Sequence, residues 1–165
     1  MTRTPPGPRF SWDFEPTARS RGPARRGIAL REAALARAPL FAGLSKRHLR
    51  AIARVAGVSE YPAGATVVKE GAAGSVFFVI LEGSARVVRG RRTVTTLRPG
   101  DFFGEMSLLD GGPRTASVTT EAPSRFLTLS GRDLKDILSR EPTLATKILG
   151  IMAGRIRSLE RPPVG

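Results

Sequence analysis

Two oppositely charged side chains stand nine positions apart in the segment 102–118, which reads FFGEMSLLDGGPRTASV. Glu105 lies near its start and Arg114 near its end, and most residues between them are small or apolar. A carboxylate accepts hydrogen bonds from sugar hydroxyls, and a guanidinium binds phosphate through charge-assisted hydrogen bonds. The pair therefore has the chemistry of a nucleotide site. The spacing alone favours a simpler interpretation, which is a salt bridge between Glu105 and Arg114 within a turn.

The pattern around these two residues indicates a short helix followed by a turn. After the turn at 99–101, the apolar positions do not alternate as in a strand, which predicts one or two helical turns from Glu105 with Gly104 at their start. A helix N-terminus presents unpaired N–H groups and a partial positive charge, which attract anions. Glycines and a proline at 111–113 then lead into a strand that opens with Arg114. An arginine delivered beside that N-terminus would bind a phosphate from a second side.

The segment GDFFGEMSLLDGGPRTASV closely resembles the phosphate-binding cassette of cyclic nucleotide-binding domains. These domains occur in regulatory subunits of the cAMP-dependent kinase, in cyclic nucleotide-gated channels and in bacterial catabolite activator-like regulators. The resemblance extends over residues 38–160 and keeps the family's order. The matching stretches are 38–45, Glu70-Gly71, 76–80, Glu82-Gly83, 103–105, the Leu108-Leu109 pair and 113–118.

The resemblance implies a role for each matching position. Glu105 corresponds to the residue that binds the ribose 2′-hydroxyl, and Arg114 to the one that pairs with the cyclic phosphate. The hydroxyl of Thr115 could reach the phosphate or the amino group of a syn guanine, so cGMP stays open beside cAMP. The other implied contacts are backbone groups that meet ribose and phosphate, and apolar side chains that pack on the base: Gly104, Met106, Ser107, Val87 and Leu97.

Composition excludes several other kinds of site. The 165 residues include no cysteine and one histidine, His48, which rules out thiolate and multi-histidine metal sites. Neither a Walker loop nor a GxGxxG motif is present, and no set of residues suggests a catalytic triad. We therefore expect no enzyme and no cofactor, with cAMP or cGMP acting as a regulatory ligand. His48 itself is expected in solvent, on the surface of a helix.

The elements that must position the site follow from changes in pattern along the chain. Residues 1–27 are rich in Pro, Gly and Arg, which predicts a disordered basic tail. A single cyclic nucleotide-binding domain is expected over 28–165, mainly β with flanking helices. Its core would be a β-roll (double-stranded jelly roll) of about eight strands. The predicted elements are helices at 28–38 and 45–56, the β-roll at about 57–130, and helices at 131–139 and 143–160.

The last predicted helix carries an arginine within its apolar face. Leu144, Ile148, Met152 and Leu159 share one side of the helix, and Arg155 lies among them. One interpretation is that Arg155 extends along this face to reach solvent. The other is that the face closes over the ligand, with Leu159 capping the base. Alignment with channel-type members of the resembled family places a base-contacting arginine at Arg155.

Two glycines lie inside the same helix and weaken it. Gly150 and Gly154 each cost roughly 1 kcal/mol of helix stability relative to alanine. Close packing against another helix, including one from a homodimer partner, would explain them. A helix that is marginal until ligand binds would explain them equally, because the ligand would then shift its population. Our hypothesis is that this helix is the signalling switch.

These observations together predict a cytoplasmic bacterial regulator that binds a cyclic nucleotide and signals to an unidentified effector protein by reorienting its C-terminal helix. No apolar run is long enough to span a membrane. The net charge of +13 suggests a polyanionic partner. However, the chain ends soon after its last predicted helix, so we expect no helix-turn-helix and no DNA binding of the usual kind. The alternatives are a basic DNA-associated transcriptional regulator and a nucleotide-free interaction module of the same fold.

Overall fold

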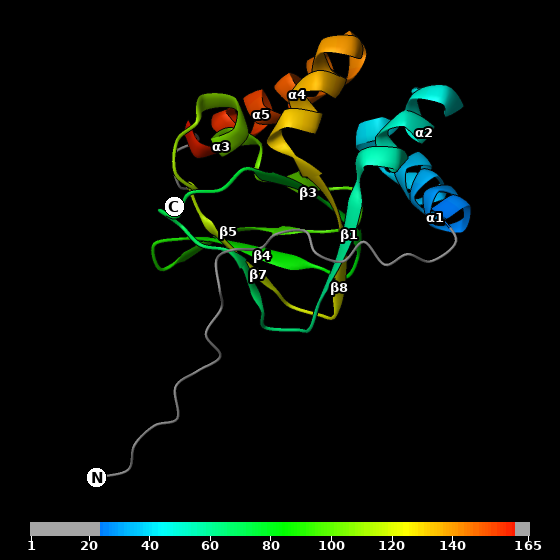
Figure 1. Ribbon diagram of the computed structural model, residues 1–165. Coiled ribbons are helices and arrows are strands. Elements are labelled where there is room, and N and C mark those ends of the chain that lie inside the picture. Colours follow the sequence, from blue (N-terminus) through cyan, green and yellow to red (C-terminus); the bar gives the residue numbers. More distant parts are fainter. Residues whose placement is uncertain (1–23, 161–165) are drawn as a thin grey trace.

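The computed structural model describes residues 24–160 and places two four-stranded sheets face to face, with helices packed on one of them (Figure 1). The helical elements are α1 (Ala24–Arg37), the 3-10 turn η1 (Pro39–Phe41), α2 (Lys46–Val55), α3 (Glu105–Asp110), α4 (Gly131–Arg140) and α5 (Pro142–Glu160). The strands are β1 (Gly57–Tyr61), β2 (Thr66–Val68), β3 (Val76–Glu82), β4 (Ala85–Arg89), β5 (Arg92–Leu97), β6 (Phe102–Phe103), β7 (Ser117–Thr120) and β8 (Ser124–Ser130).

The strand order confirms the predicted roll. One sheet has the order β1-β8-β3-β6 and the other β2-β7-β4-β5, and every pair is antiparallel. The chain changes sheet at every connection between consecutive strands except the one from β4 to β5, which stays within one sheet. Such repeated crossing is typical of a jelly roll. The fold is therefore mainly β with flanking helices, as the sequence predicts.

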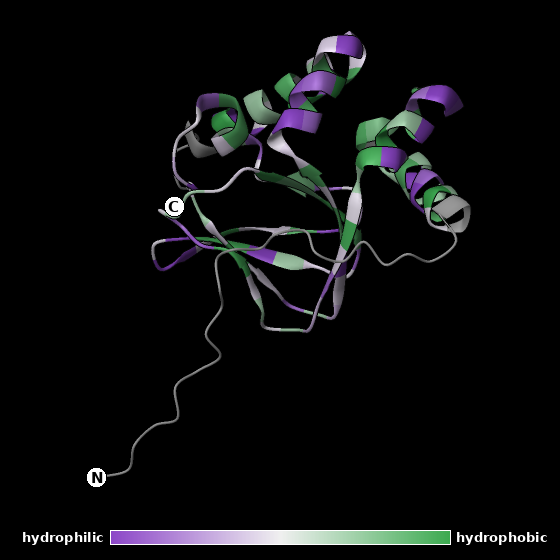
Figure 2. Ribbon diagram, viewed as in Figure 1, coloured by the Kyte–Doolittle hydropathy of each residue, from purple (hydrophilic) through white to green (hydrophobic). Residues whose placement is uncertain are grey.

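Strand β3 shows why the run SVFFVILE is apolar without alternation. Phe77 and Val79 belong to the core on the helix side of the sheet, whereas Phe78 and Ile80 belong to the core between the sheets. Successive side chains of a strand point to opposite faces, so a strand covered on both faces requires apolar residues at every position. Figure 2 shows the ribbon of β3 mostly in the hydrophobic colour, between the helices and the second sheet.

Two hydrophobic clusters follow from this arrangement. The larger one joins the outer face of the β1-β8-β3-β6 sheet to the helices and includes Phe41 and Ile148. In the smaller one, between the sheets, the ring of Phe78 stacks on Phe103 with centroids 4.7 Å apart, and Phe126 meets both rings edge-on. Phe103 ends β6, and only Gly104 separates it from α3. The aromatic packing therefore fixes the point at which α3 begins.

Helix boundaries agree with the sequence except at the first helix. The hydroxyls of Ser45 and Ser130 accept hydrogen bonds from the N–H groups of His48 and Asp133, at 3.3 and 3.1 Å, and so cap α2 and α4. Helix α1 begins at Ala24, so the prediction of a disordered tail to residue 27 is wrong for residues 24–27. The alanine and arginines there favour a helix enough to carry it through one glycine. The rest of the predicted tail lies outside the described residues.

The two-residue strand β6 was not predicted. Phe102 and Phe103 pair with Val79 and Phe78 of β3, but two residues are too few to show a strand period. From the sequence they read as the approach to the following helix. Among residues 24–160, no helix has both the length and the apolar character needed to cross a membrane.

Candidate functional site

The candidate site begins where the chain passes from β6 into α3. Gly104 caps the helix with a backbone φ of +92°, in the left-handed region that strains other residues. A Cβ at this position would also lie 2.6 Å from the carbonyl oxygen of Val76 and 2.9 Å from Nη1 of Arg114. Conformation and close approach therefore both require glycine. Helix α3 starts at Glu105, which confirms the short helix predicted from that residue.

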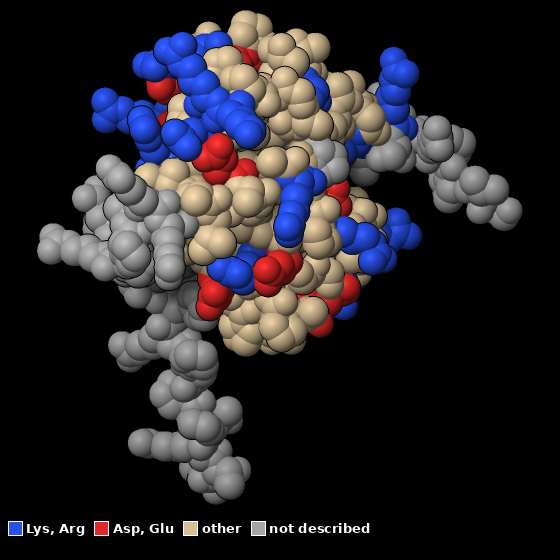
Figure 3. Space-filling model, turned by 90° about the vertical axis from the view of Figure 1, so that its right-hand side faces the viewer, with Lys and Arg blue, Asp and Glu red and all other residues tan. Residues whose placement is uncertain are grey.

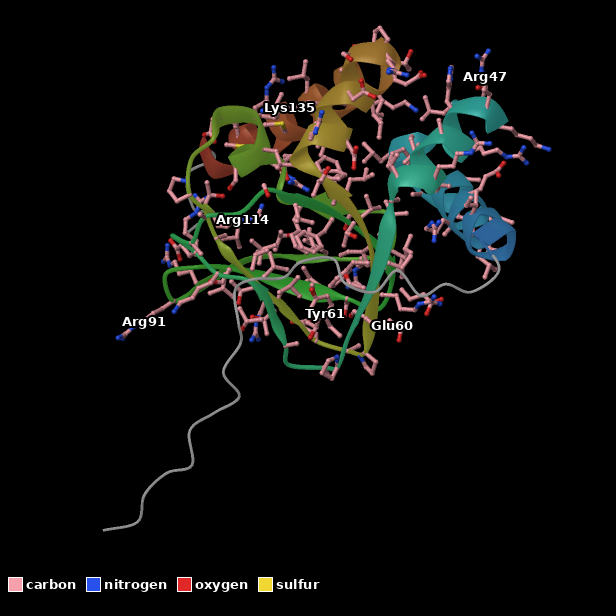
Figure 4. All side chains as sticks on the ribbon, in the orientation of Figure 1. Arg47, Glu60, Tyr61, Arg91, Arg114 and Lys135 are labelled. Carbon is pink, nitrogen blue, oxygen red and sulfur yellow. The ribbon has the colours of Figure 1, made fainter. Side chains whose placement is uncertain are left out.

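Arg114 lies buried between α3 and the sheet that contains β4, β5 and β7 (Figure 4). Its Nη1 donates to the carbonyl oxygen of Gly104 at 3.1 Å, and its Nη2 donates to that of Val76 at 3.0 Å. Burial lowers the pKa of the Arg114 guanidinium, and the negative charge of Glu105 opposes that shift. The residue is 6% exposed. Because a buried cation is costly, an anion that reaches this guanidinium would stabilise it.

The loop before β3 holds the backbone of the same arginine. The N–H of Arg114 donates to the carbonyl of Ala72, and the N–H of Gly71 donates to the carbonyl of Arg114, both at 2.8 Å. The loop 71–76 thus holds Arg114 in two places. Gly71 and Ala72 bind its main chain, and the carbonyl of Val76 binds its guanidinium. The position of the arginine is set by this loop as much as by the cassette.

Glu105 has a different partner from the one that spacing alone suggested. Its carboxylate is 3% exposed and forms an ion pair with Nη1 of Arg155 on α5, fifty residues later in the chain. Among the described residues it forms no ion pair with Arg114. The salt bridge within a turn is therefore not what the structure contains. The two charges instead lie at separate points of the site, with Glu105 linked to the last helix.

Arg155 joins α5 to the cassette through several contacts. Besides its ion pair with Glu105, its Nη2 donates to the carbonyl oxygen of Phe102 at 2.7 Å, and its Cζ lies 4.7 Å from the centroid of the Phe102 ring. Leu144 and Ile148 on the same helix face are buried, and the Arg155 side chain is 38% exposed. The arginine within the apolar face is thus held by the protein rather than extended alone into solvent. Its contact with a base stays a prediction.

The remaining predicted site residues lie around these charges. Ser107 is buried in α3, whereas Met106 and Thr115 are exposed. Leu97 is buried in the core between the sheets, and Val87 packs against that core from β4. The site therefore has a polar side at the cassette and an apolar side at the second sheet. Leu159 lies in the last turn of α5, and its side chain falls outside the described residues.

Sequence reasoning missed three residues that shape the site. The carbonyl of Val76 accepts from Arg114, Gly74 lies against the guanidinium of the same arginine, and Phe102 contacts Arg155 through its carbonyl and its ring. Two of these contacts use backbone oxygens, which every residue carries. Gly74 gave no signal either, because glycine is common in loops and the guanidinium beside it is known only from the structure.

The fold and the buried charges define a class of protein, a β-roll domain with a helix-bearing cassette suited to a small anionic ligand. Residues 58–141, just over half of the chain, match the family model described as "Cyclic nucleotide-binding domain". The chain belongs to this family.

Similar proteins come from several branches of the family. A CRP-like cAMP-activated global transcriptional regulator of Mycobacterium tuberculosis is 32% identical over 128 residues, covering 74% of this chain and 57% of the relative. A cAMP-dependent protein kinase regulatory subunit of Mycosarcoma maydis is 36% identical over 138 residues, covering 78% of this chain and 24% of the relative. The crystal structure of the Thermus thermophilus catabolite activator protein superposes with a TM-score of 0.68 at 31% identity, covering 74% of this chain and 60% of that one. The chain thus spans less than two thirds of the length of each.

Proposed function

We propose that this chain is a regulatory domain, not an enzyme, that binds a cyclic nucleotide at the cassette, with cAMP as the first candidate and cGMP as the second. The observation that carries the proposal is Arg114, a buried guanidinium held by the carbonyls of Gly104 and Val76. An arginine has five N–H donors, so these bonds leave others in the same plane for phosphate oxygens. The names of the similar regulator and kinase subunit support cAMP as the ligand.

The other site residues would take the remaining parts of the nucleotide. Glu105 would accept a hydrogen bond from the ribose 2′-hydroxyl, and backbone groups of Gly104, Met106 and Ser107 would meet ribose and phosphate. Val87 and Leu97 would pack against the base from the second sheet, which the apolar packing of that sheet supports. Thr115 is exposed, and its hydroxyl would reach the phosphate or, with cGMP, the amino group of a syn guanine.

The signal would leave the domain through α5. Arg155 contacts the carboxylate of Glu105, and a ribose hydroxyl bound to that carboxylate would compete with it or share it. Either outcome changes the contacts that hold α5 on the cassette. Among the described residues, no atom lies within 4 Å of the place where a Cβ of Gly150 or Gly154 would stand, so packing within that part of the chain does not require glycine at either position. Their effect is to weaken the helix, which supports α5 as the element that moves. The receiver would be an effector protein or a second copy of the chain.

Calorimetric titration with cAMP and cGMP tests the proposal. The wild-type protein should bind at least one of them, and Arg114→Ala should weaken binding by roughly 2–5 kcal/mol, because the phosphate loses a buried charged partner. Arg47→Ala is the matched control, since Arg47 is an exposed arginine on α2, far from Arg114 (Figure 4). Unchanged affinity in Arg114→Ala would reject this site.

A further inference from the structure

Gly74 lies closer to the guanidinium of Arg114 than a side chain would allow. A Cβ at this glycine would be 2.3 Å from Nε, 2.5 Å from Nη2 and 2.6 Å from Cζ of Arg114. The backbone does not require glycine here, because Gly74 is not among the glycines with positive φ. A left-handed backbone is therefore not the reason for glycine here, and the close approach of the Arg114 guanidinium is what excludes a side chain.

The guanidinium cannot move aside without loss. It is buried, and it donates to the carbonyl oxygens of Val76 and Gly104 at 3.0 and 3.1 Å. The main chain of Arg114 is bonded to Gly71 and Ala72, so the whole residue cannot shift either. Displacing the side chain would break hydrogen bonds of a charged group inside a buried site, where they are hard to replace.

We propose that Gly74 is a positioning residue for anion recognition. The lack of a side chain at position 74 leaves the space in which the Arg114 guanidinium lies, and so sets how well Arg114 binds the ligand's phosphate. Gly74 acts through Arg114 and need not touch the ligand. The inference rests on the proposed function for the identity of the anion, whereas the placement of Arg114 is a property of the chain alone.

Calorimetry on Gly74→Ala tests the effect on the ligand. We expect the affinity for cAMP to fall about tenfold or more, which corresponds to about 1.4 kcal/mol. Adenosine carries no phosphate and reports on the rest of the pocket, so its affinity should not change.

The matched control is Ala73→Ser, which adds one atom at the exposed neighbouring position and should leave both affinities unchanged. Equal cAMP affinity in Gly74→Ala and wild type would overturn the proposal. An equal loss for cAMP and adenosine would also overturn it, because it would indicate general damage to the pocket.

A double-mutant cycle tests the route through Arg114 without any nucleotide. Urea unfolding would be compared for wild type, Gly74→Ala, Arg114→Ala and the double variant. If the added methyl acts on the guanidinium, Gly74→Ala lowers the unfolding midpoint of the wild type but not that of Arg114→Ala. In the second background the alanine should be neutral or slightly stabilising, because it restricts the unfolded chain. Equal losses in both backgrounds would show that Gly74 acts on the loop alone and would refute the positioning role.

The two experiments separate this inference from the proposed function. If the wild type binds neither cAMP nor cGMP, the proposed function fails, and the unfolding cycle still decides whether Gly74 positions Arg114. If the wild type binds and Gly74→Ala binds equally well, the proposed function stands and the positioning role is wrong.

Discussion

At the scale of single residues, the site depends on two buried charges whose partners come from distant parts of the chain. Arg114 donates to a carbonyl thirty-eight residues earlier, at Val76, and Glu105 pairs with Arg155, fifty residues later. Each charge is thereby stabilised in a different way. The cation is held by backbone oxygens, which add no negative charge, so it is suited to receive an anion. The carboxylate already has a cation beside it, so it is suited to a neutral hydroxyl.

The role of Glu105 can be tested with a ligand that lacks one hydroxyl. A hydrogen bond to a charged acceptor contributes roughly 1.5–3 kcal/mol, so the wild type should prefer cAMP over 2′-deoxy-cAMP by about tenfold or more. Glu105→Gln keeps the shape but loses the charge, and the preference should fall to a few-fold. Calorimetry with both nucleotides measures the ratio.

Arg114→Ala is the control for that ratio. It should weaken both nucleotides alike, because Arg114 is assigned to the phosphate, which both carry. If wild type binds cAMP and 2′-deoxy-cAMP equally, Glu105 does not bind the 2′-hydroxyl.

The identities of these residues could be predicted from the sequence, but their partners could not. Glu105 and Arg114 stand out as an acid and a base among small residues, and the resemblance gave each a role. A carbonyl acceptor such as that of Val76 has no signature, because every residue has one. The sequence likewise gives no sign that position 74 requires glycine, because the group that excludes a side chain there is a guanidinium forty positions away in sequence. Contacts that depend on tertiary packing cannot be predicted from the pattern and spacing of residues in the sequence.

At the scale of elements, the patterned segments were predicted well and the shortest one was missed. Helix α2 has a strong helical periodicity and lies within one residue of its predicted bounds at 45–56, and strand β3 covers all but the first residue of the long apolar run SVFFVILE. Strand β6 has only two residues, and its pairing with β3 is fixed by the stacking of Phe103 on Phe78. Helix α1 starts earlier than predicted because one glycine does not end a helix. The missed strand lies within the cassette, just before α3.

Helix α5 should respond to ligand in hydrogen exchange. Its contacts with the cassette run through Arg155, and its two glycines weaken it, so its opening free energy should be low. We expect amide protection of residues 143–160 to change when cAMP binds. Without cAMP, Arg155→Ala should lower protection in the same segment. Mass spectrometry of exchanged peptides measures both effects.

Peptides from β1 supply the internal reference for that experiment, because the main packing partner of β1 is β8, and neither α5 nor the cassette is among its main contacts. Protection of 143–160 that is identical with and without cAMP would contradict α5 as the switch.

At the scale of the whole molecule, the helices from the two ends of the described chain form one layer. His48 of α2 pairs with Glu141 between α4 and α5, with 2.9 Å between Nε2 and Oε1. Nζ of Lys147 on α5 donates to the carbonyl of Ala42, just after η1. The prediction of a surface His48 is confirmed, because its side chain is exposed, and the structure adds an ion-pair partner that the sequence did not indicate. These contacts mean that any movement of α5 has to be accommodated by the first helices.

The same helical layer carries much of the positive charge. This charge bears on the alternative that the protein is a DNA-associated regulator, because a basic surface binds DNA in a salt-dependent way. Figure 3 shows Lys and Arg side chains gathered on the upper part of one face, at the height of the helices. On α2, Lys46, Arg47, Arg50 and Arg54 are exposed, and Arg50 forms an ion pair with Glu32. Such a surface attracts phosphate backbones without reading sequence.

We therefore expect weak DNA binding in gel shifts at 50 mM salt, equal for unrelated sequences and lost by about 200 mM. A protein that contacts several phosphates loses roughly three orders of magnitude or more in affinity over that range. Replacing Arg47 and Arg54 together by alanine should reduce the salt slope by about two, because each phosphate contact releases about one counterion. The cAMP affinity of that variant should equal that of the wild type, since neither residue lies at the cassette. Sequence-selective binding that persists at 200 mM salt would instead favour a DNA-associated regulator, because specific sites are bound at least about a thousandfold more tightly than random ones.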